Sequence, residues 1–186
     1  NLTTLSDYAA TLLLSYDRIV YLDVDALPSN AAAIFRNATV SPVRKRGFLS
    51  EQIAKELVNG ECSELSEYTS LDEVAADILS GYEGDLSLEG ITTLSLTTAS
   101  MLSRHSSGEL WLDGLHELSA ELATALAPHC DRLTLDGVRE LSLEAANAIA
   151  NRSGALSLNA ITTLTDEVAE VLSESKICRL ELCSLT

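Results

Sequence analysis

One line of residues occurs four times in succession in this chain, beginning at Leu86, Leu110, Leu133 and Leu156. These leucines are 24, 23 and 23 residues apart, and Leu180 begins a further line 24 residues later. A period this short holds one supersecondary unit per repeat, and such a unit buries its apolar face only against its neighbours. The sequence therefore predicts a solenoid, in which the repeats stack on one another.

Each line has two halves with different periodicities. The leading L-x-L alternates as a half-buried strand does, and a tight turn such as Asp113-Gly114 follows it. We expect glycine in this turn because glycine accepts a positive φ without a steric penalty. In the second half, Leu118, Leu122 and Leu126 recur at helical spacing. Acidic residues occupy the expected first helical turn, where the helix dipole favours negative charge. The positions expected for the N-caps hold Ser95, Ser119, Ser142 and Thr165.

The pattern continues upstream in a weaker form. Matches to the helical half begin at Leu5, Leu49 and Leu71, strand halves occur at 21–24 and 63–65, and 28–36 resembles a shortened repeat. We expect a single array over residues 1–186, with about seven to eight turns, degenerate over 1–62 and regular over 63–182. Because both ends fall inside repeats, we expect an open-ended fragment of a longer protein whose bare ends associate end to end.

The charge of the chain limits its partners. The sequence has 28 acidic and 12 basic residues, for a formal net charge of −16. Nucleic acids and anionic membrane surfaces both attract Lys and Arg, so we expect neither as a partner. No apolar run approaches the roughly 18 residues of a membrane span. The location stays open, and a cell-surface or secreted position is one alternative.

The apolar positions of the four lines resemble those of the leucine-rich repeat superfamily. They are Leu86/Leu88/Ile91/Leu94, Leu110/Leu112/Leu115/Leu118, Leu133/Leu135/Val138/Leu141 and Leu156/Leu158/Ile161/Leu164. The resemblance implies an α/β solenoid, with short parallel strands on one face and short helices on the other, and a protein-binding role. The chain lacks the Asn or Cys of the standard internal ladder, and its next apolar position follows the strand by three residues instead of five. In this it resembles an atypical bacterial variant found in long tandem arrays.

The residue between the two strand leucines is expected to face outward. Trp111, the one tryptophan of the chain, stands there between the small residues Ser87 and Thr134, so we expect it to protrude. An exposed tryptophan on a flat sheet is a candidate binding anchor, because tryptophan often dominates interface energies. The alternative is a tryptophan that folds over its neighbours and binds nothing. The nearby charged residues Glu109 and Arg132 are further candidates for binding.

A second outward column is acidic, with Glu89, Asp113 and Asp136 followed by Asn159. Carboxylates about 4.8 Å apart repel each other, so the column needs an explanation. Local bonding of each carboxylate to backbone N–H groups of its own turn is the favoured one. Binding of Ca²⁺ and a surface for a basic partner are the alternatives. We retain Glu89, Asp113 and Asp136 as candidate binding residues and predict no metal site.

The remaining candidates for chemistry are scattered. His105, His116 and His129 occupy three different positions relative to the strand leucines, so we expect surface or loop histidines. The four cysteines form no CxxC pair, and strands two steps apart separate Cys130 from Cys178 by ~9–10 Å, so we expect free thiols. The basic run 44–46 is expected to be a solvated loop, with the acidic sheet of another copy or an acidic ligand as alternative contacts.

No Ser/His/Asp grouping or Gly-rich phosphate loop is present in the sequence, so we predict no enzyme and no cofactor. The leading hypothesis is a non-catalytic protein-interaction module that presents its sheet face. The alternative is a structural spacer of a large bacterial repeat protein with no ligand of its own. A third hypothesis is a regulatory part of an enzyme whose chemistry lies outside this segment.

Overall fold

The computed structural model describes residues 20–21, 29–36, 43–44, 47–61, 65–129 and 131–184. The chain divides into two compact units, Asn1–Phe48 and Leu49–Thr186. In the first unit, β1 (Val20–Tyr21) pairs in parallel with β2 (Val43–Arg44), and α2 (Ser29–Arg36) lies between them in the sequence. The helix predicted after Leu5, strand residues 22–24, and Cys62 and Cys130 lie outside the described residues.

The second unit is a regular stack of strand–helix repeats. Five strands form one parallel sheet in chain order, and their register places equivalent leucines side by side. These strands are β5 (Leu86–Ser87), β6 (Leu110–Trp111), β7 (Leu133–Thr134), β8 (Leu156–Ser157) and β9 (Leu180–Glu181). The pairing confirms that each L-x-L opens a strand of a parallel sheet.

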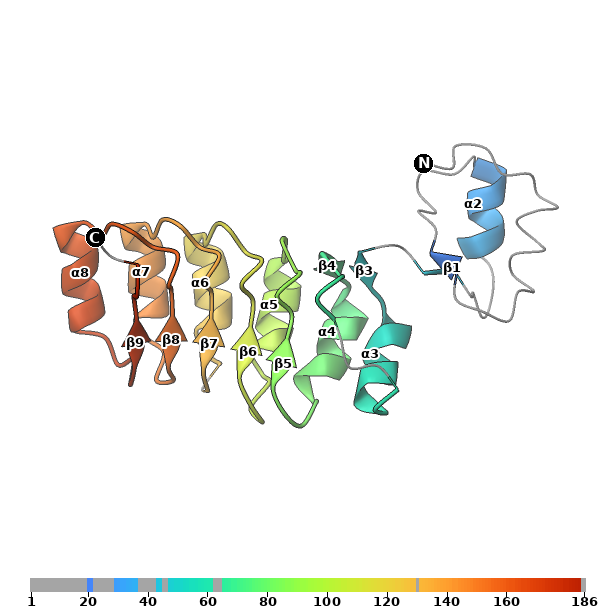
Figure 1. Cartoon of the computed structure of the whole chain (residues 1–186), viewed down its shortest axis with the longest axis horizontal. Coiled ribbons are helices and arrows are strands. Elements are labelled where there is room, and N and C mark those ends of the chain that lie inside the picture. Colours follow the sequence, from blue (N-terminus) through green and yellow to red (C-terminus); the bar gives the residue numbers. More distant parts are fainter. Residues whose placement is uncertain are drawn as a thin grey trace. The chain divides into compact units, whose positions relative to one another are not determined.

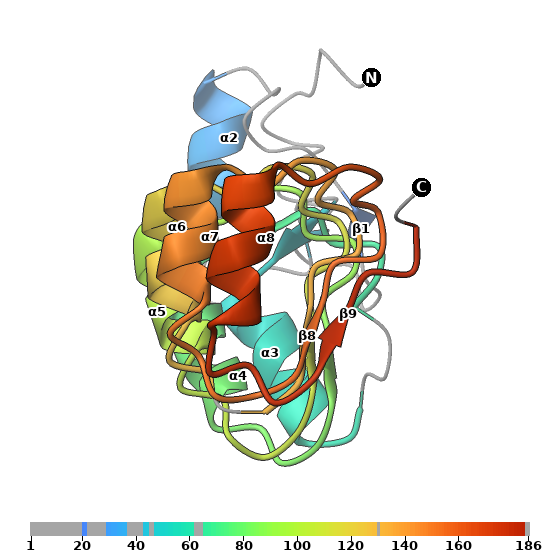
Figure 2. The same ribbon diagram turned by 90° about the vertical axis from the view of Figure 1, so that its left-hand side faces the viewer.

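The helices of the second unit pack side by side in the same order (Figure 1). They are α3 (Glu51–Val58), α4 (Glu73–Ser80), α5 (Leu96–Leu102), α6 (Ala120–Leu126), α7 (Leu143–Ile149) and α8 (Asp166–Ser173). In the view along the stack, helices α5 to α8 lie on one side and strands β8 and β9 on the other (Figure 2). The predicted α/β solenoid, with strands on one face and helices on the other, is therefore confirmed. Among the described helices, none combines the length and apolar character that a membrane span requires.

Two further strands pair at a different point of the repeat. β3 (Phe48–Leu49) and β4 (Ser70–Leu71) form a two-stranded sheet directly before the helices α3 and α4. Leu49 and Leu71 are buried there, as Leu118 and Leu141 are at the equivalent position of later repeats. The early repeats thus keep the apolar pattern of the later ones although their ladder hydrogen bonds form elsewhere.

Columns of equivalent side chains build the core of this unit. Both leucines of each L-x-L in β5 to β8 are at most 1% exposed. The helices contribute a column of fully buried alanines, namely Ala54, Ala76, Ala99, Ala123 and Ala146. A side chain as small as a methyl group lets adjacent helices approach closely, which explains the alanine found four residues after the N-caps of these helices.

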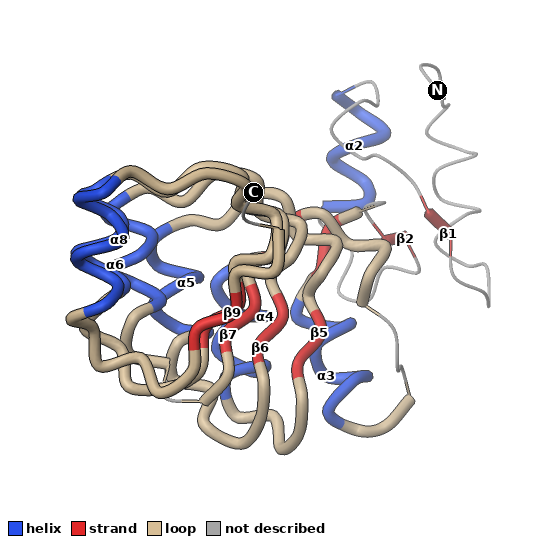
Figure 3. Tube along the Cα trace, turned by 60° about the vertical axis from the view of Figure 1, so that its left-hand side comes forward, coloured by secondary structure: helices blue, strands red, loops and turns tan. Residues whose placement is uncertain are grey.

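The expected N-caps are present in the structure. Except at Ser50, the N-cap of α3, the side-chain oxygen of the cap accepts the backbone N–H of the residue three positions on. Ser119 accepts from Leu122 at 3.2 Å, and Ser142 accepts from Ala145 at 3.1 Å. The same bond is made by Asp72, Ser95 and Thr165. Figure 3 shows the short helices that these caps begin, set apart from the strands by long connecting loops.

The turn glycines are explained differently from our expectation. Among the described residues, positive φ angles occur at Gly47, Gly60 and Gly84, not at the turn glycines. A Cβ atom on Gly137 would instead lie 2.0 Å from the carbonyl oxygen of Asp113 in the preceding repeat. Close backbone approach between repeats therefore favours glycine here, because the turns stack directly on one another.

Candidate interaction surface

A ladder of side-chain hydrogen bonds connects the turns of successive repeats. Asp113 Oδ1 accepts the backbone N–H of Asp136 at 2.9 Å, and Asp136 Oδ1 accepts that of Asn159 at 2.8 Å. Asn159 Oδ1 then accepts the backbone N–H of Cys183 at 2.9 Å. Each side chain therefore bonds the equivalent residue of the next repeat, where we expected bonds within a single turn.

The carboxylate of Asp136 accepts three hydrogen bonds in this ladder. Its Oδ1 also accepts the Ser157 hydroxyl at 2.6 Å, and its Oδ2 accepts the Asn159 side-chain amide at 3.1 Å. These donors stabilise the carboxylate and explain why Asp and Asn recur here. Glu89, at the start of the column, is exposed, and its side chain makes no hydrogen bond among the described residues. In the same part of the chain, no three His, Cys, Asp or Glu side chains are grouped to hold a metal ion.

On the sheet face, a connected set of side chains extends from β6 to β9. Trp111 Nε1 donates to Glu109 Oε2 at 3.0 Å, and the same oxygen lies 3.8 Å from Arg132 Nε. Arg132 Nη2 reaches Glu181 Oε2 at 2.7 Å, and Arg179 Nε lies 2.9 Å from Glu181 Oε1. We call these five residues the sheet-face network. The structure thus brings together Trp111, Glu109 and Arg132, which the sequence identified as separate candidates.

The sheet-face network covers part of the column of residues between the strand leucines, which the sequence predicts to be exposed. Trp111 is partly buried, while Thr134 and Ser157, which also belong to the outward column, are only 5% and 0% exposed. Trp111 lies opposite Thr134 in the sheet register, and Ser157 lies opposite Glu181. The large side chains of the network flank the two small residues and enclose them, so Trp111 does not stand clear of a flat sheet as we expected.

Two of the histidines lie in loops, as expected, but are not exposed at the surface. His105 and His129 are both fully buried, and their rings lie parallel with centroids 6.0 Å apart. Both follow an N-cap serine by ten residues, and Arg152 follows Ser142 by the same interval. The positions of His105, His129 and Arg152 relative to the strand leucines do not show this equivalence, because the loop between these residues and the next strand varies in length. His116 is exposed, as expected.

His129 and Arg152 contact backbone carbonyl oxygens of the loops that follow the helices. The ring nitrogens of His129 lie 2.7 Å from the carbonyl oxygen of His105 and 3.1 Å from that of Arg132. The Arg152 guanidinium, which is itself buried, donates to the carbonyl oxygens of Asp131, His129 and Ala155. We call His105, His129 and Arg152 the inner column.

Burial lowers the pKa of both inner-column histidines. For His129, the carbonyl oxygens of Arg132 and His105 act in the opposite direction, while the charges of Arg152 and His105 lower the pKa further. For His105, the Gly84 carbonyl and the carboxylates of Asp85 and Asp131 oppose the effect of burial on the pKa. Both side chains therefore favour the neutral form.

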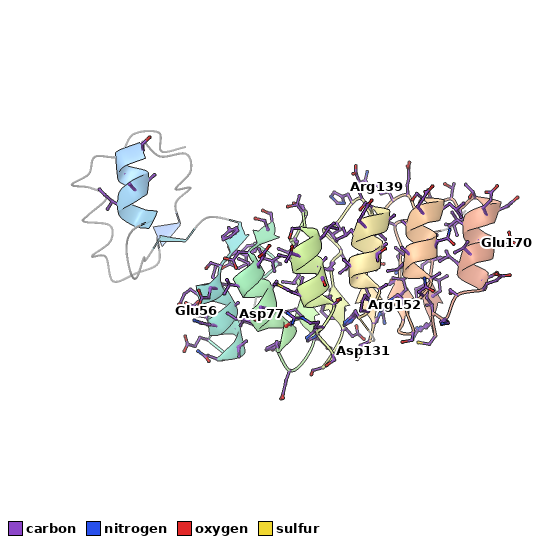
Figure 4. All side chains as sticks on the ribbon, turned by 180° about the vertical axis from the view of Figure 1, so that it is seen from behind. Glu56, Asp77, Asp131, Arg139, Arg152 and Glu170 are labelled. Carbon is purple, nitrogen blue, oxygen red and sulfur yellow. The ribbon has the colours of Figure 1, made fainter. Side chains whose placement is uncertain are left out.

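A groove of about 940 Å³ lies at the edge where α5, α6 and α7 begin. Its lining includes Leu115, Leu118 and Leu141, which are buried, and Glu117 and Glu140, which are exposed. Figure 4 shows Arg139, another lining residue, at this edge, opposite the edge that holds Asp131 and Arg152. Glu117, Arg139 and Glu140 were not among the residues predicted from the sequence to bind a partner, although they differ from the equivalent residues of the neighbouring repeats.

Comparisons with protein-family models, with curated proteins and with solved structures found no match. Function is therefore argued from the surface itself. Cys178 and Cys183, the two cysteines within the described residues, are free and exposed, as expected from their spacing.

Proposed function

We propose that the repeat array is a non-catalytic interaction module that presents its sheet face to a protein partner. The observation that carries this proposal is the hydrogen bond from the Trp111 indole to Glu109, which holds the one tryptophan of the chain in place on the sheet. A side chain that is ordered before binding loses less conformational entropy when a partner covers it. Trp and Arg are also the residue types that most often dominate interface energies.

The position of Arg132 supports the same proposal. Its side chain is 30% exposed and lies between the carboxylates of Glu109 and Glu181. A partner that covers this network would exclude water from ion pairs that are already aligned, and such pairs contribute to specificity more than to affinity. We therefore infer a partner surface with an apolar pocket for Trp111 and polar groups around it.

We also propose that the array is related to the leucine-rich repeat superfamily, in an atypical bacterial form. The spacing of the apolar residues and the alternation of parallel strands with helices support this relationship. The protein-binding role that the resemblance implies agrees with the proposal for the sheet face.

The second candidate function is a structural spacer. The turn ladder and the N-caps account for most of the repeated polar residues without any ligand. In a spacer, the sheet-face network would serve only to cover Thr134 and Ser157. The two functions differ in whether Trp111 contributes to binding.

Selection of a displayed random-peptide library on the array distinguishes the two functions. We expect enriched peptides whose affinity falls by about tenfold or more for Trp111→Ala, since tenfold corresponds to ~1.4 kcal/mol. Val74→Ala is the matched control, because Val74 is an exposed apolar residue on α4. Failure to enrich any peptide, or enrichment of peptides that bind Trp111→Ala as well as wild type, would favour the spacer.

A further inference from the structure

The groove at the start of α5 to α7 differs in character from the sheet face. Its floor is apolar, with Leu115, Leu118 and Leu141 buried beneath it. Leu96, the first residue of α5, lines the groove and is 51% exposed, and Leu143, the first residue of α7, is 39% exposed. The groove therefore combines an apolar floor with one large exposed aliphatic side chain in its lining, Leu96. Leu143 lies beside the groove, directly after the lining residue Ser142.

The charged residues at the groove are not required by the stacking of repeats. The repeats that begin at Leu86 and Leu156 carry the pairs Thr92-Thr93 and Thr162-Thr163. The two central repeats carry His116-Glu117 and Arg139-Glu140 at the same positions. Since the outer repeats adopt the same strand–helix unit with threonines, the charges of the central repeats have no role in forming it.

These charges also have no partners within the described part of the chain. None of the ion pairs there involves Glu117, Arg139 or Glu140. The charged residues of the sheet-face network, in contrast, pair with one another. The groove is therefore the place where charge on the central repeats is free to meet an external group.

The balance of this charge is negative. Glu117 and Glu140 line the groove, and Glu121 and Glu144 follow on the exposed first turns of α6 and α7, against the single Arg139. The whole second unit, residues 49–186, has 24 acidic against 7 basic residues, a net charge of −17. A cationic segment is thus attracted both by the groove and by the unit that contains it.

From this arrangement we propose that the groove is a second binding surface, which takes an extended segment of a partner protein carrying Lys or Arg beside aliphatic side chains. The aliphatic side chains would contact Leu96, Leu143 and the leucine floor. The cationic groups would pair with Glu117 and Glu140 at the rim. This surface lies at the helix-starting edge, and the proposal does not depend on the sheet face.

Two labelled peptides of equal length, one alternating Leu with Lys and the other Leu with Glu, test the proposal by fluorescence anisotropy. We expect the Leu/Lys peptide to bind and the double variant Glu117→Gln/Glu140→Gln to weaken it about fivefold or more. Glu73→Gln/Glu170→Gln is the matched control, since it removes the same charge from exposed positions on α4 and α8. We expect that control to change the affinity less than about twofold.

Leu96→Ser/Leu143→Ser tests the exposed aliphatic side chains in and beside the groove and should also weaken binding of the Leu/Lys peptide. Circular dichroism melts check that each variant keeps its fold. If both Glu→Gln double variants weakened peptide binding equally, the peptide would be attracted by the overall negative charge of the protein and not by the groove. That result would overturn the proposal. Unchanged binding by the groove variants, or equal binding of the Leu/Glu peptide, would overturn it as well. Trp111→Ala should leave this peptide's affinity unchanged, which separates the outcome from that of the sheet face.

Discussion

Gly137 lies so close to the preceding repeat that an added methyl group would force the neighbouring backbone to shift. Its Cβ position would be 2.0 Å from the backbone carbonyl oxygen of Asp113. We expect Gly137→Ala to lower the free energy of unfolding by roughly 1–3 kcal/mol in urea denaturation, because backbone of one repeat must shift. Ala160 occupies the equivalent place in the next repeat, so the stack admits such a shift at a cost.

Gly81→Ala is the control for that substitution. The nearest atom to its Cβ position is the Ile78 carbonyl oxygen at 3.7 Å, an ordinary contact, and its φ is not positive. We expect a change within about 0.5 kcal/mol for this variant. Equal destabilisation by the two substitutions would contradict the close-approach explanation of the turn glycines.

Asp136 should be the most sensitive member of the turn ladder. Removing its carboxylate leaves the buried Ser157 hydroxyl and the Asn159 backbone N–H without their acceptor. Asp136→Ala should therefore lower the free energy of unfolding by about 1–3 kcal/mol, and Asp136→Asn by less, because one oxygen remains. Glu89→Ala, in the same column but exposed, should change it by less than about 0.5 kcal/mol. Similar losses for Ala at both positions would show that the ladder bonds do not stabilise the stack.

The residues that the sequence identified correctly are those whose role is set within one repeat or by its period. The strand leucines and the N-cap serines belong to this class, since alternation and helical spacing determine them locally. The burial of Thr134 and Ser157 depends instead on side chains from other repeats. Arg132 and Glu181 are 49 residues apart, and no local pattern indicates that they meet. Trp111 was therefore recognised as unusual, while its hydrogen bond to Glu109 was not predicted.

At the scale of elements, the loops after the helices hold equivalent buried side chains that their sequences do not reveal. They share neither length nor residue type, which is why the equivalence of His105, His129 and Arg152 was missed. The structure aligns them because all three lie ten residues beyond an N-cap, and the helices keep a constant length up to that point. A count made from the helix start, in place of the strand, would have found the inner column.

The inner column makes stability depend on pH. The pKa values of His105 and His129 are lowered in the folded protein, chiefly by burial, so the unfolded chain binds protons more readily. Stability from these groups is full above the unfolded-state pKa of about 6.5 and is lost as the pH falls below it, until the folded-state pKa is passed. We expect the urea midpoint to fall between about pH 6.5 and pH 5, before carboxylates near their usual pKa of about 4 are protonated.

Substitution of single histidines distinguishes their contribution to the pH dependence of stability from that of other titratable groups. His129→Gln should flatten the dependence of the urea midpoint in that pH range, whereas His116→Gln, at an exposed position, should keep the wild-type slope. A urea midpoint of the wild-type protein that stays constant between about pH 7 and about pH 5 would contradict this account of the inner column. Glu121 and Glu167, in the first turns of α6 and α8, affect stability only at lower pH. Their pKa values are lowered by hydrogen bonds to the backbone at the helix N-terminus and to the cap hydroxyl.

At the scale of the whole molecule, charge is distributed unevenly between the two units. Residues 1–48 contain 4 acidic and 5 basic residues, a net charge of +1, against −17 for residues 49–186. Self-repulsion within the second unit opposes its compact state. We expect the urea midpoint to rise as sodium chloride increases from about 0.01 to 0.15 M, because the screening length falls from about 30 to about 8 Å. A midpoint that falls with salt would mean that favourable ion pairs outweigh the repulsion.

The fold of the second unit was largely predictable, since a repeat with one strand and one helix can bury its apolar face only by stacking. The sequence could not predict which surface is free for a partner. Charges on the sheet face pair across repeats, whereas Glu117, Arg139 and Glu140 stay unpaired among the described residues, and this difference exists only in three dimensions. Both surfaces hold residues that depart from the repeat, but the sequence pointed only to the sheet face, and the groove is seen only in the structure.

The central claim is that residues which depart from the repeat serve binding, while the repeated residues hold the stack together. It is tested most directly by the affinity of Trp111→Ala for a peptide selected on the wild-type array, measured beside its urea midpoint. We predict an affinity loss of about tenfold or more, ~1.4 kcal/mol, with unfolding changed by less than about 1 kcal/mol. Unchanged affinity together with a loss of stability of several kcal/mol, as for a core leucine, would contradict the claim.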